Sequence, residues 1–203
     1  MFKAVLDANV LYPFLLRDIL IRISQQELYK ALWTDKIHSE WINALLGKRP
    51  DINRENLERT KELMNLAISD ATIEGYENIV ETLSLPDEND RHVLAAAIKA
   101  NAEMVVTSNI KDFPQDILDQ YDIEAIHPDD FILCQIDLNP GAVRASILSA
   151  LSELRNPTIS VADYLTNLEK TGLTKTVSRL KKMGIESSIM EELSLHKSNH
   201  LFH

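Results

Sequence analysis

Short apolar runs alternate with amphipathic segments along residues 1–135. Residues 3–6 (KAVL) and 28–33 are typical of short buried strands, because they are apolar and bounded by polar residues. Residues 103–109 (EMVVTSN) predict another strand, and the segment 123–133 predicts a strand followed by a helix. Strands that alternate with helices favour a parallel sheet covered by helices on both faces, which is an α/β fold.

Apolar residues recur at helical spacing between these strands. Proline favours the first turn of a helix, and Thr or Asn favours the position before it. The expected helices are one begun at Pro13, one capped by Thr34 that ends near Gly47 and Pro50, one begun at Asn53, one over 73–83, an Ala-rich one headed by Asp90, a short one within 111–121, and one begun at Pro128.

The pattern changes near residues 137–143 (DLNPGAV), where proline and glycine interrupt the chain. Beyond this break only helical segments are expected, at about 141–154, 160–171 and 173–183, before a weakly patterned tail after 186. We therefore divide the chain into a domain of residues 1–135 and a helical C-terminal extension of residues 136–203.

Charge and cysteine content limit the function. The net charge is −10, and residues 1–135 hold 24 of the 31 acidic residues but only 13 of the 21 basic ones. Such a surface disfavours simple phosphate binding, unless bound divalent cations supply positive charge. The single Cys134 forms no internal disulfide, and no apolar run has the length of a membrane span. We expect a cytoplasmic protein without a membrane segment.

Polar side chains follow two of the predicted strands. Asp7 and Asn9 come just after the first strand, and Thr107, Ser108, Asn109 and Asp112 come just after the strand in 103–109. In an open α/β sheet, ligands bind at the carboxyl ends of the strands. If these two strands are neighbours, Asp7 and Asp112 meet at one edge.

Two further acids fit the same edge. Asp90 heads the Ala-rich helix, where Asp87 and Asp90 stand at capping-box spacing, and we interpret Asp87 as the cap and Asp90 as the ligand. Glu40 lies early in the helix capped by Thr34. Clustered carboxylates repel one another, so a fold that gathers them favours a hard cation with oxygen ligands. Such ions activate water for attack on a phosphodiester. Taken singly, each acid has an ordinary role as a cap, a solvated acid or a turn residue, so the inference depends on the set.

Several segments together resemble the PIN domain family, and within it the bacterial VapC-like toxins of toxin–antitoxin pairs. They are "VLDANVL", Glu40 in "HSEW", "LPDENDRHVLAAAIKANAEMVVTSNIKDFP" and "IHPDDFI", which cover about residues 1–135. The resemblance implies a three-layer α/β/α nuclease with a central parallel sheet, whose acids hold Mg²⁺ or Mn²⁺ and which cuts RNA. By motif, the four family acids are Asp7, Glu40, Asp90 and Asp112.

The sequence departs from the family pattern at one position, and the resemblance implies several binding partners. Asn109 stands near a position where many relatives have an aspartate, so Asn109 and Asp112 could share the last corner of the site. Asn9, Thr107 and Ser108 would steady the site or the scissile phosphate. The implied partners are an RNA substrate, a cognate antitoxin and a second copy of the chain. Exposed Phe14, Leu15 and Ile19 would suit the dimer or antitoxin interface.

Three rival functions are compared with the nuclease, and the sequence argues against the second and the third. A PIN fold with an incomplete metal site could serve only in binding or assembly, which the asparagine at 109 favours. A flap-type DNA nuclease would carry more acidic residues and additional DNA-binding elements, which this sequence does not show. A phosphatase with an aspartyl nucleophile would need an aspartate at position 9, where the chain has asparagine.

The remaining candidates favour structural roles. We expect His92 to be structural rather than a general base, and we expect no metal site at His196 and His200. Two helices around Gly172 faintly resemble a helix-turn-helix, but DNA binding is not expected there. A basic stripe is interpreted as a solvated face that could touch RNA phosphates, and it consists of Lys175, Arg179, Lys181 and Lys182. The sequence does not identify the RNA target or the antitoxin.

Overall fold

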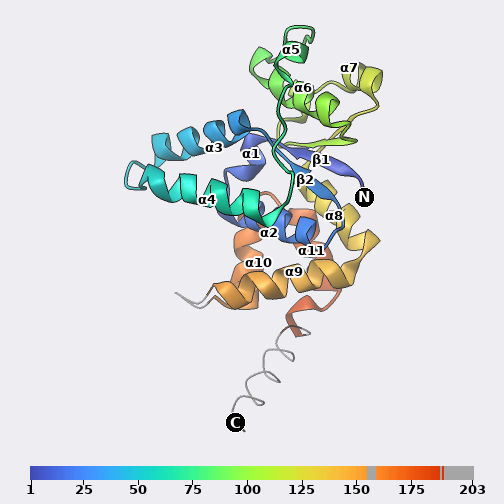
Figure 1. The fold of residues 1–203 in the computed structure, drawn as a ribbon. Helices are drawn as coiled ribbons and strands as arrows, with labels where there is room; N and C mark the ends of the chain where they lie inside the picture. The colour runs from blue at the N-terminus through green and yellow to red at the C-terminus, as the bar shows by residue number, and fades with distance from the viewer. Residues whose placement is uncertain (155–158, 188, 190–203) are drawn as a thin grey trace.

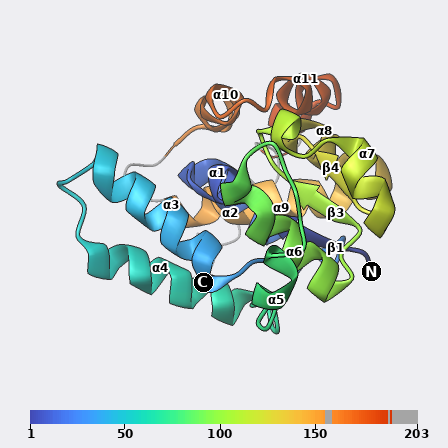
Figure 2. The same ribbon diagram turned by 90° about the horizontal axis from the view of Figure 1, so that it is seen from above.

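A four-stranded parallel sheet lies at the centre of the molecule (Figures 1 and 2). The computed structural model describes residues 1–154, 159–187 and 189. The strands are β1 (Lys3–Leu6), β2 (Lys30–Leu32), β3 (Met104–Val106) and β4 (Glu124–Ile126). Their order is β2-β1-β3-β4, and every neighbouring pair is parallel. The prediction of a parallel α/β sheet is confirmed.

Helices cover the sheet on both sides. In Figure 1, α6 lies above the sheet, whereas α2, α8 and α9 lie below it, which gives the three-layer α/β/α arrangement. The helical elements are α1 (Ala8–Leu11), α2 (Phe14–Gln25), α3 (Asp35–Lys48), α4 (Arg54–Ala67), α5 (Glu77–Val80), η1 (Glu88–Asp90), α6 (Arg91–Ala100), η2 (Ile110–Asp112), α7 (Gln115–Leu118), η3 (Asp119–Tyr121), α8 (Pro128–Leu138), α9 (Pro140–Glu153), α10 (Val161–Lys170) and α11 (Thr174–Lys182).

Local capping explains where several helices begin. The Thr34 side chain accepts a hydrogen bond from Ile37 N at 3.1 Å, and the Asn53 side chain accepts one from Glu55 N at 2.9 Å. Asp87 caps η1 by accepting from Asn89 N at 2.9 Å. These side chains satisfy backbone donors that have no partner within the first helical turn. The interpretation of Asp87 as the cap, which leaves the Asp90 side chain without a capping bond, is confirmed.

The prediction of a helix over 73–83 is wrong, because only Glu77–Val80 is helical there. The backbone before it pairs with the residue that follows β2 instead. Ile73 N donates to Trp33 O at 2.8 Å, and Trp33 N donates to Ala71 O at 3.0 Å. A bonding partner distant in sequence therefore overrides the local apolar pattern. The short helix α1 between β1 and Pro13 was not predicted.

Helix α2 lies between the sheet and the extension, and this position corrects one expectation. Phe14 is 54% exposed and Leu15 is half-buried, but Ile19 is only 2% exposed and cannot serve an interface. Helices α9 and α10 pack against α2, so the face that carries Ile19 belongs to the core.

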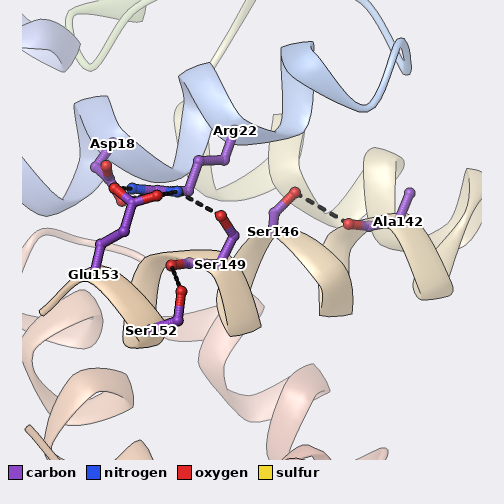
Figure 3. Close-up of polar contacts among 7 residues, drawn as sticks. All are labelled: Asp18, Arg22, Ala142, Ser146, Ser149, Ser152 and Glu153. Carbon is purple, nitrogen blue, oxygen red and sulfur yellow. Dashed lines mark hydrogen bonds and ion pairs between the residues drawn. The ribbon is translucent and has the colours of Figure 1, made fainter.

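Arg22 of α2 joins the extension to the sheet domain by polar contacts. Its guanidinium donates to Asp18 on its own helix, and to Ser149 and Glu153 on α9, at 2.7 to 3.1 Å (Figure 3). Asp18 and Glu153 hold the pKa of Arg22 above its usual range, with hydrogen bonding to Glu153 as the largest cause. This bidentate contact fixes α9 along α2.

A buried carboxylate anchors the end of the extension. Asp129 of α8 is 2% exposed and accepts hydrogen bonds from Lys175 N at 2.8 Å and Thr176 N at 2.7 Å. It therefore caps the first turn of α11 from another helix. Helix α8 runs through residue 135, where we place the boundary between the domain and the extension. The division into two parts stays a prediction.

Candidate active site

The central pair of strands brings Asp7 and Thr107 together at the carboxyl edge of the sheet. Leu6 of β1 lies opposite Val106 of β3, so the next residue of each strand shares this edge. Thr107 Oγ1 donates to Asp7 Oδ2 at 2.7 Å, and Asp7 N donates to Val106 O at 3.1 Å. The expectation that these two strands are neighbours is confirmed.

Asp7 is both a helix cap and a member of this edge. Its carboxylate accepts from Ala8 N at 2.6 Å, which begins α1, and it also accepts from the Asn9 side-chain amide. The side chain is only 4% exposed. Burial raises the pKa of Asp7, the hydrogen bonds from Thr107 and Ala8 oppose the rise, and the charge of Glu40 adds to it.

Asn9 connects the two loops that follow β1 and β3. Its Nδ2 donates to Thr107 Oγ1 at 2.9 Å, while its Oδ1 accepts from Ser108 N at 2.9 Å. Asn109 N donates to Thr107 Oγ1 at 3.1 Å. The side chain of Asn9 thus holds Asp7 and the 107–109 loop in one network, which is the position expected of a supporting residue.

Glu40 enters the site from α3, where it meets His92 of α6. Its Oε1 lies 2.9 Å from His92 Nε2, and its side chain is 36% exposed whereas that of His92 is 2% exposed. The other ring nitrogen, His92 Nδ1, has no hydrogen-bond partner among the described residues. The contact therefore brings one ring nitrogen of a buried histidine on α6 against the carboxylate of an acid on α3.

Asp90 and Asp112 complete the set of acids. Asp90 stands at the junction of η1 and α6, and Asp112 ends η2; both are half-buried. The pKa of Asp90 is raised to about 7, first by burial and then by the nearby charges of Asp7, Asp87, Asp112 and Glu40. The other three acids of the sequence prediction therefore lie within electrostatic reach of Asp90.

The donor set fits a hard divalent cation in its chemistry. Mutually repelling, half-buried carboxylates lose that repulsion when a cation binds among them. Within the described residues, no group of three or more His, Cys, Asp or Glu side chains is arranged so as to hold a metal ion. Glu40 is turned to His92 and Asp7 to its three donors. The four-acid metal site stays a prediction.

A groove opens beside the acids, between α1 and α3. Its volume is about 330 Å³, and it shares Asn9 and Glu40 with the acid cluster. The other lining residues are Ala8, Tyr12, Trp41, Ala44 and Lys48. The sequence analysis did not single out Tyr12 or Lys48, nor did it expect His92 to touch Glu40. Only the meeting of α3 with α1 and α6 reveals these contacts.

The basic stripe on α11 is partly neutralised. Lys175 Nζ lies 2.6 Å from Asp130, and Arg179 lies 2.9 Å from Asp137, both on α8. Helices α10 and α11 do flank Gly172 as expected. His196 and His200 lie outside the described residues. In the part of the chain that the structure describes, none of the helices has the length and apolar character needed to cross a membrane.

Comparison with known protein families shows to which family the chain is related. A family model described as "PIN domain" matches residues 3–111, more than half of the chain. The chain belongs to the PIN domain family. A second model, described as "VapC50 C-terminal domain", matches residues 128–182 of this PIN protein, which span α8 to α11.

A curated protein is similar in sequence to this PIN protein. It is the Mycobacterium tuberculosis (strain ATCC 25618 / H37Rv) protein named "Putative ribonuclease VapC50", which is 45% identical over 83 residues. The match covers 41% of this chain and 48% of the relative, so the chain spans about half the length of the relative it matches. No solved structure matches this PIN protein.

Proposed function

We propose that this PIN protein is a Mg²⁺- or Mn²⁺-dependent endoribonuclease and the toxin of a toxin–antitoxin pair. The observation that carries the proposal is that Asp7, Glu40 and Asp112 lie near enough to Asp90 for their charges to add to the effect of burial, and together these effects raise the pKa of Asp90 to about 7. We prefer RNA as the substrate because the Mycobacterium tuberculosis relative is named "Putative ribonuclease VapC50".

The chain's own residues have distinct tasks in this proposal. Asp7, Glu40, Asp90 and Asp112 would hold the cation and position an RNA phosphodiester against it. When bound, such an ion offsets phosphate charge and makes a water molecule acidic enough to attack. Asn9, Thr107 and the 107–109 loop keep the Asp7 carboxylate in one orientation. A carboxylate of the set accepts the proton of the attacking water.

A homodimer, an antitoxin and a cytoplasmic location belong to the same proposal. Phe14, Leu63 and Leu66 are 54%, 51% and 77% exposed on α2 and α4. Helices α2 and α4, together with Glu153 of α9, line a groove of about 290 Å³, and Phe14 and Leu63 are among its lining residues. Burial of such side chains favours association with a second copy or an antitoxin segment.

The rival function is a binding or assembly module with a dead metal site. Asn109 favours it, because an amide at that corner adds no negative charge to the set. A calorimetric titration with Mn²⁺ separates the two. The nuclease should bind Mn²⁺, and binding should weaken in Asp112→Asn; a dead site should release no heat.

Cleavage of total RNA tests the enzyme directly. The purified protein should cut RNA in the presence of Mn²⁺ and not in the presence of EDTA. Single-stranded DNA is tested in parallel, because a flap-type nuclease would cut DNA instead. Asp7→Asn should abolish cleavage while the circular dichroism spectrum stays unchanged. The matched control is Asp116→Asn, an exposed acid on α7, which should leave cleavage unaltered. Retained cleavage by a clean Asp7→Asn preparation would contradict the proposal.

A further inference from the structure

The groove between α1 and α3 combines an apolar floor with an aromatic wall. Trp41 forms the floor and is fully buried, with the Arg17 guanidinium 4.6 Å from its ring centroid. Ala8 and Ala44 add small apolar side chains, and the half-buried Tyr12 ring lines the groove at the end of α1. A groove of about 330 Å³ with these walls is of the size and polarity that receive small flat molecules.

The rim of the groove carries one positive charge. Lys48 at the end of α3 is exposed, and its Nζ lies 5.4 Å from the Tyr12 ring centroid. A contact of this kind between exposed groups is weak, so the ammonium group can turn to another partner at little cost. In a chain of net charge −10, a lysine beside the acid cluster complements a phosphate.

The groove adjoins the acid cluster, because Glu40 lines the groove and so does Asn9, whose side-chain amide donates to Asp7. A chain molecule whose phosphate lies at the acids therefore places its neighbouring unit in the groove. In single-stranded RNA that unit is a nucleotide with a free base, and unstacked bases bind proteins by stacking on aromatic side chains. A peptide would fill the apolar floor equally well, but only a peptide with an acidic side chain at the right place would also pair with the cation at the rim.

We propose that this groove is a nucleobase subsite of the RNA-binding surface, in which Tyr12 stacks on the base next to the scissile phosphate and Lys48 contacts a backbone phosphate. The subsite rests on the proposed ribonuclease function, and it adds residues that determine how single-stranded RNA is held. Trp41 and Ala44 set the depth of the groove and hence the size of the base that it accepts.

Binding of a fluorescent RNA tests the subsite without any need for cleavage. The probe is a single-stranded RNA of random sequence in which 2-aminopurine replaces adenine, added to the full chain in Ca²⁺. Binding should quench the probe, because the base stacks. Tyr12→Leu should weaken binding roughly tenfold and abolish the quenching, whereas Tyr12→Phe should keep both. If Tyr12→Leu fails to fold, Ala44→Leu, at an exposed position on α3, should fill the groove without adding an aromatic ring and should give the same loss.

The lysine has its own matched control. Lys48→Ala should weaken RNA binding and reduce the slope of log affinity against log salt by about 0.7, the value for one phosphate contact in a single strand. Lys36→Ala, an exposed lysine at the other end of α3, should leave that slope unchanged.

The outcomes separate the subsite from the enzyme. One outcome would overturn the subsite and leave the ribonuclease intact: the wild type cuts RNA, while folded Tyr12→Leu and Ala44→Leu bind and quench the probe as the wild type does. That outcome would favour a peptide as the occupant of the groove. If the RNA binds, its fluorescence is quenched in a way that depends on Tyr12, and it is never cut, the result would support the subsite and contradict the proposed ribonuclease function. No binding of RNA by the wild-type chain would also overturn the subsite.

Discussion

His92 Nε2 lies 2.9 Å from Glu40 Oε1, so a buried imidazole on α6 holds a half-exposed carboxylate that comes from α3. The two residues are 52 positions apart, and their contact fixes how one acid of the candidate site is turned. The geometry makes His92 a candidate positioning residue for Glu40, through a contact that the sequence analysis did not expect.

Replacing His92 should disturb metal binding more than folding. Residues that orient a ligand typically change metal affinity or activity by about 10- to 100-fold when mutated. We expect His92→Leu to weaken Mn²⁺ binding, measured by calorimetry, and RNA cleavage to that extent. His92→Gln keeps an N–H donor and should restore much of both.

The matched control for His92 is another buried histidine. His38 on α3 is fully buried, and its Nδ1 accepts from Trp41 Nε1 at 3.0 Å instead of touching an acid of the cluster. His38→Gln should lower the melting temperature without changing the Mn²⁺ affinity of the folded protein. Equal effects of the His38 and His92 variants on Mn²⁺ affinity would contradict a positioning role.

Asp90 should make the metal-free protein less stable as pH rises. Its pKa is raised to about 7 when folded and returns to about 4 when unfolded. Between these values the folded state keeps a proton that the unfolded state has lost, so the free energy of unfolding falls from pH 4 to pH 7. Asp90→Asn removes this effect and should stabilise the protein at pH 8 by about 1 kcal/mol, after allowance for solvent screening of the half-exposed group.

Urea unfolding at several pH values, in EDTA, measures the Asp90 effect. The difference between wild type and Asp90→Asn should vanish near pH 4. Saturating Mn²⁺ should raise the stability of the wild type more than that of the variant, since only a ligand that prefers the folded state stabilises it. A variant that is less stable than the wild type at pH 8 would refute the assignment of Asp90 to a repulsive cluster.

Asp129 should matter far more to stability than its neighbour Asp130. Asp129 is buried and accepts two backbone N–H groups of α11, whereas Asp130 pairs with Lys175 Nζ where both side chains are well exposed. We expect Asp129→Asn to lower the free energy of unfolding by about 1–3 kcal/mol, because the new amide group faces a backbone donor.

The Asp130→Asn variant provides the comparison by the same urea titration. An exposed ion pair contributes little, so its loss should cost less than about 0.5 kcal/mol. Similar losses in the two variants would show that the capping of α11 by Asp129 does not contribute as described.

The sequence predicts the parts of the fold that depend on local pattern and on general rules of chain connection. The apolar runs at 3–6 and 103–109 locate β1 and β3, and the tendency of parallel strands to share a carboxyl edge places Asp7 beside Thr107. Capping residues such as Thr34 and Asn53 mark helix starts to within a residue, because the capping bond is local.

Contacts between distant segments account for what the sequence does not predict. Ile73 looks like part of a helix, yet its backbone pairs with Trp33, which no local signal reveals. The burial of Ile19 depends on the helices of the extension, and the Glu40–His92 contact joins two helices, α3 and α6, that are far apart in the sequence. The groove beside Tyr12 also arises from contacts between segments that are distant in the sequence, here α1 and α3.

The packing of α9 along α2 has a practical consequence for anyone who shortens the chain. Expression of residues 1–135 alone would cut α8 before its end and strip the cover from Ile19 and its neighbours on α2. Such a fragment would expose a large apolar surface to water, and it would precipitate or bind other proteins non-specifically. Failure of the fragment to cut RNA would therefore say nothing about its carboxylates.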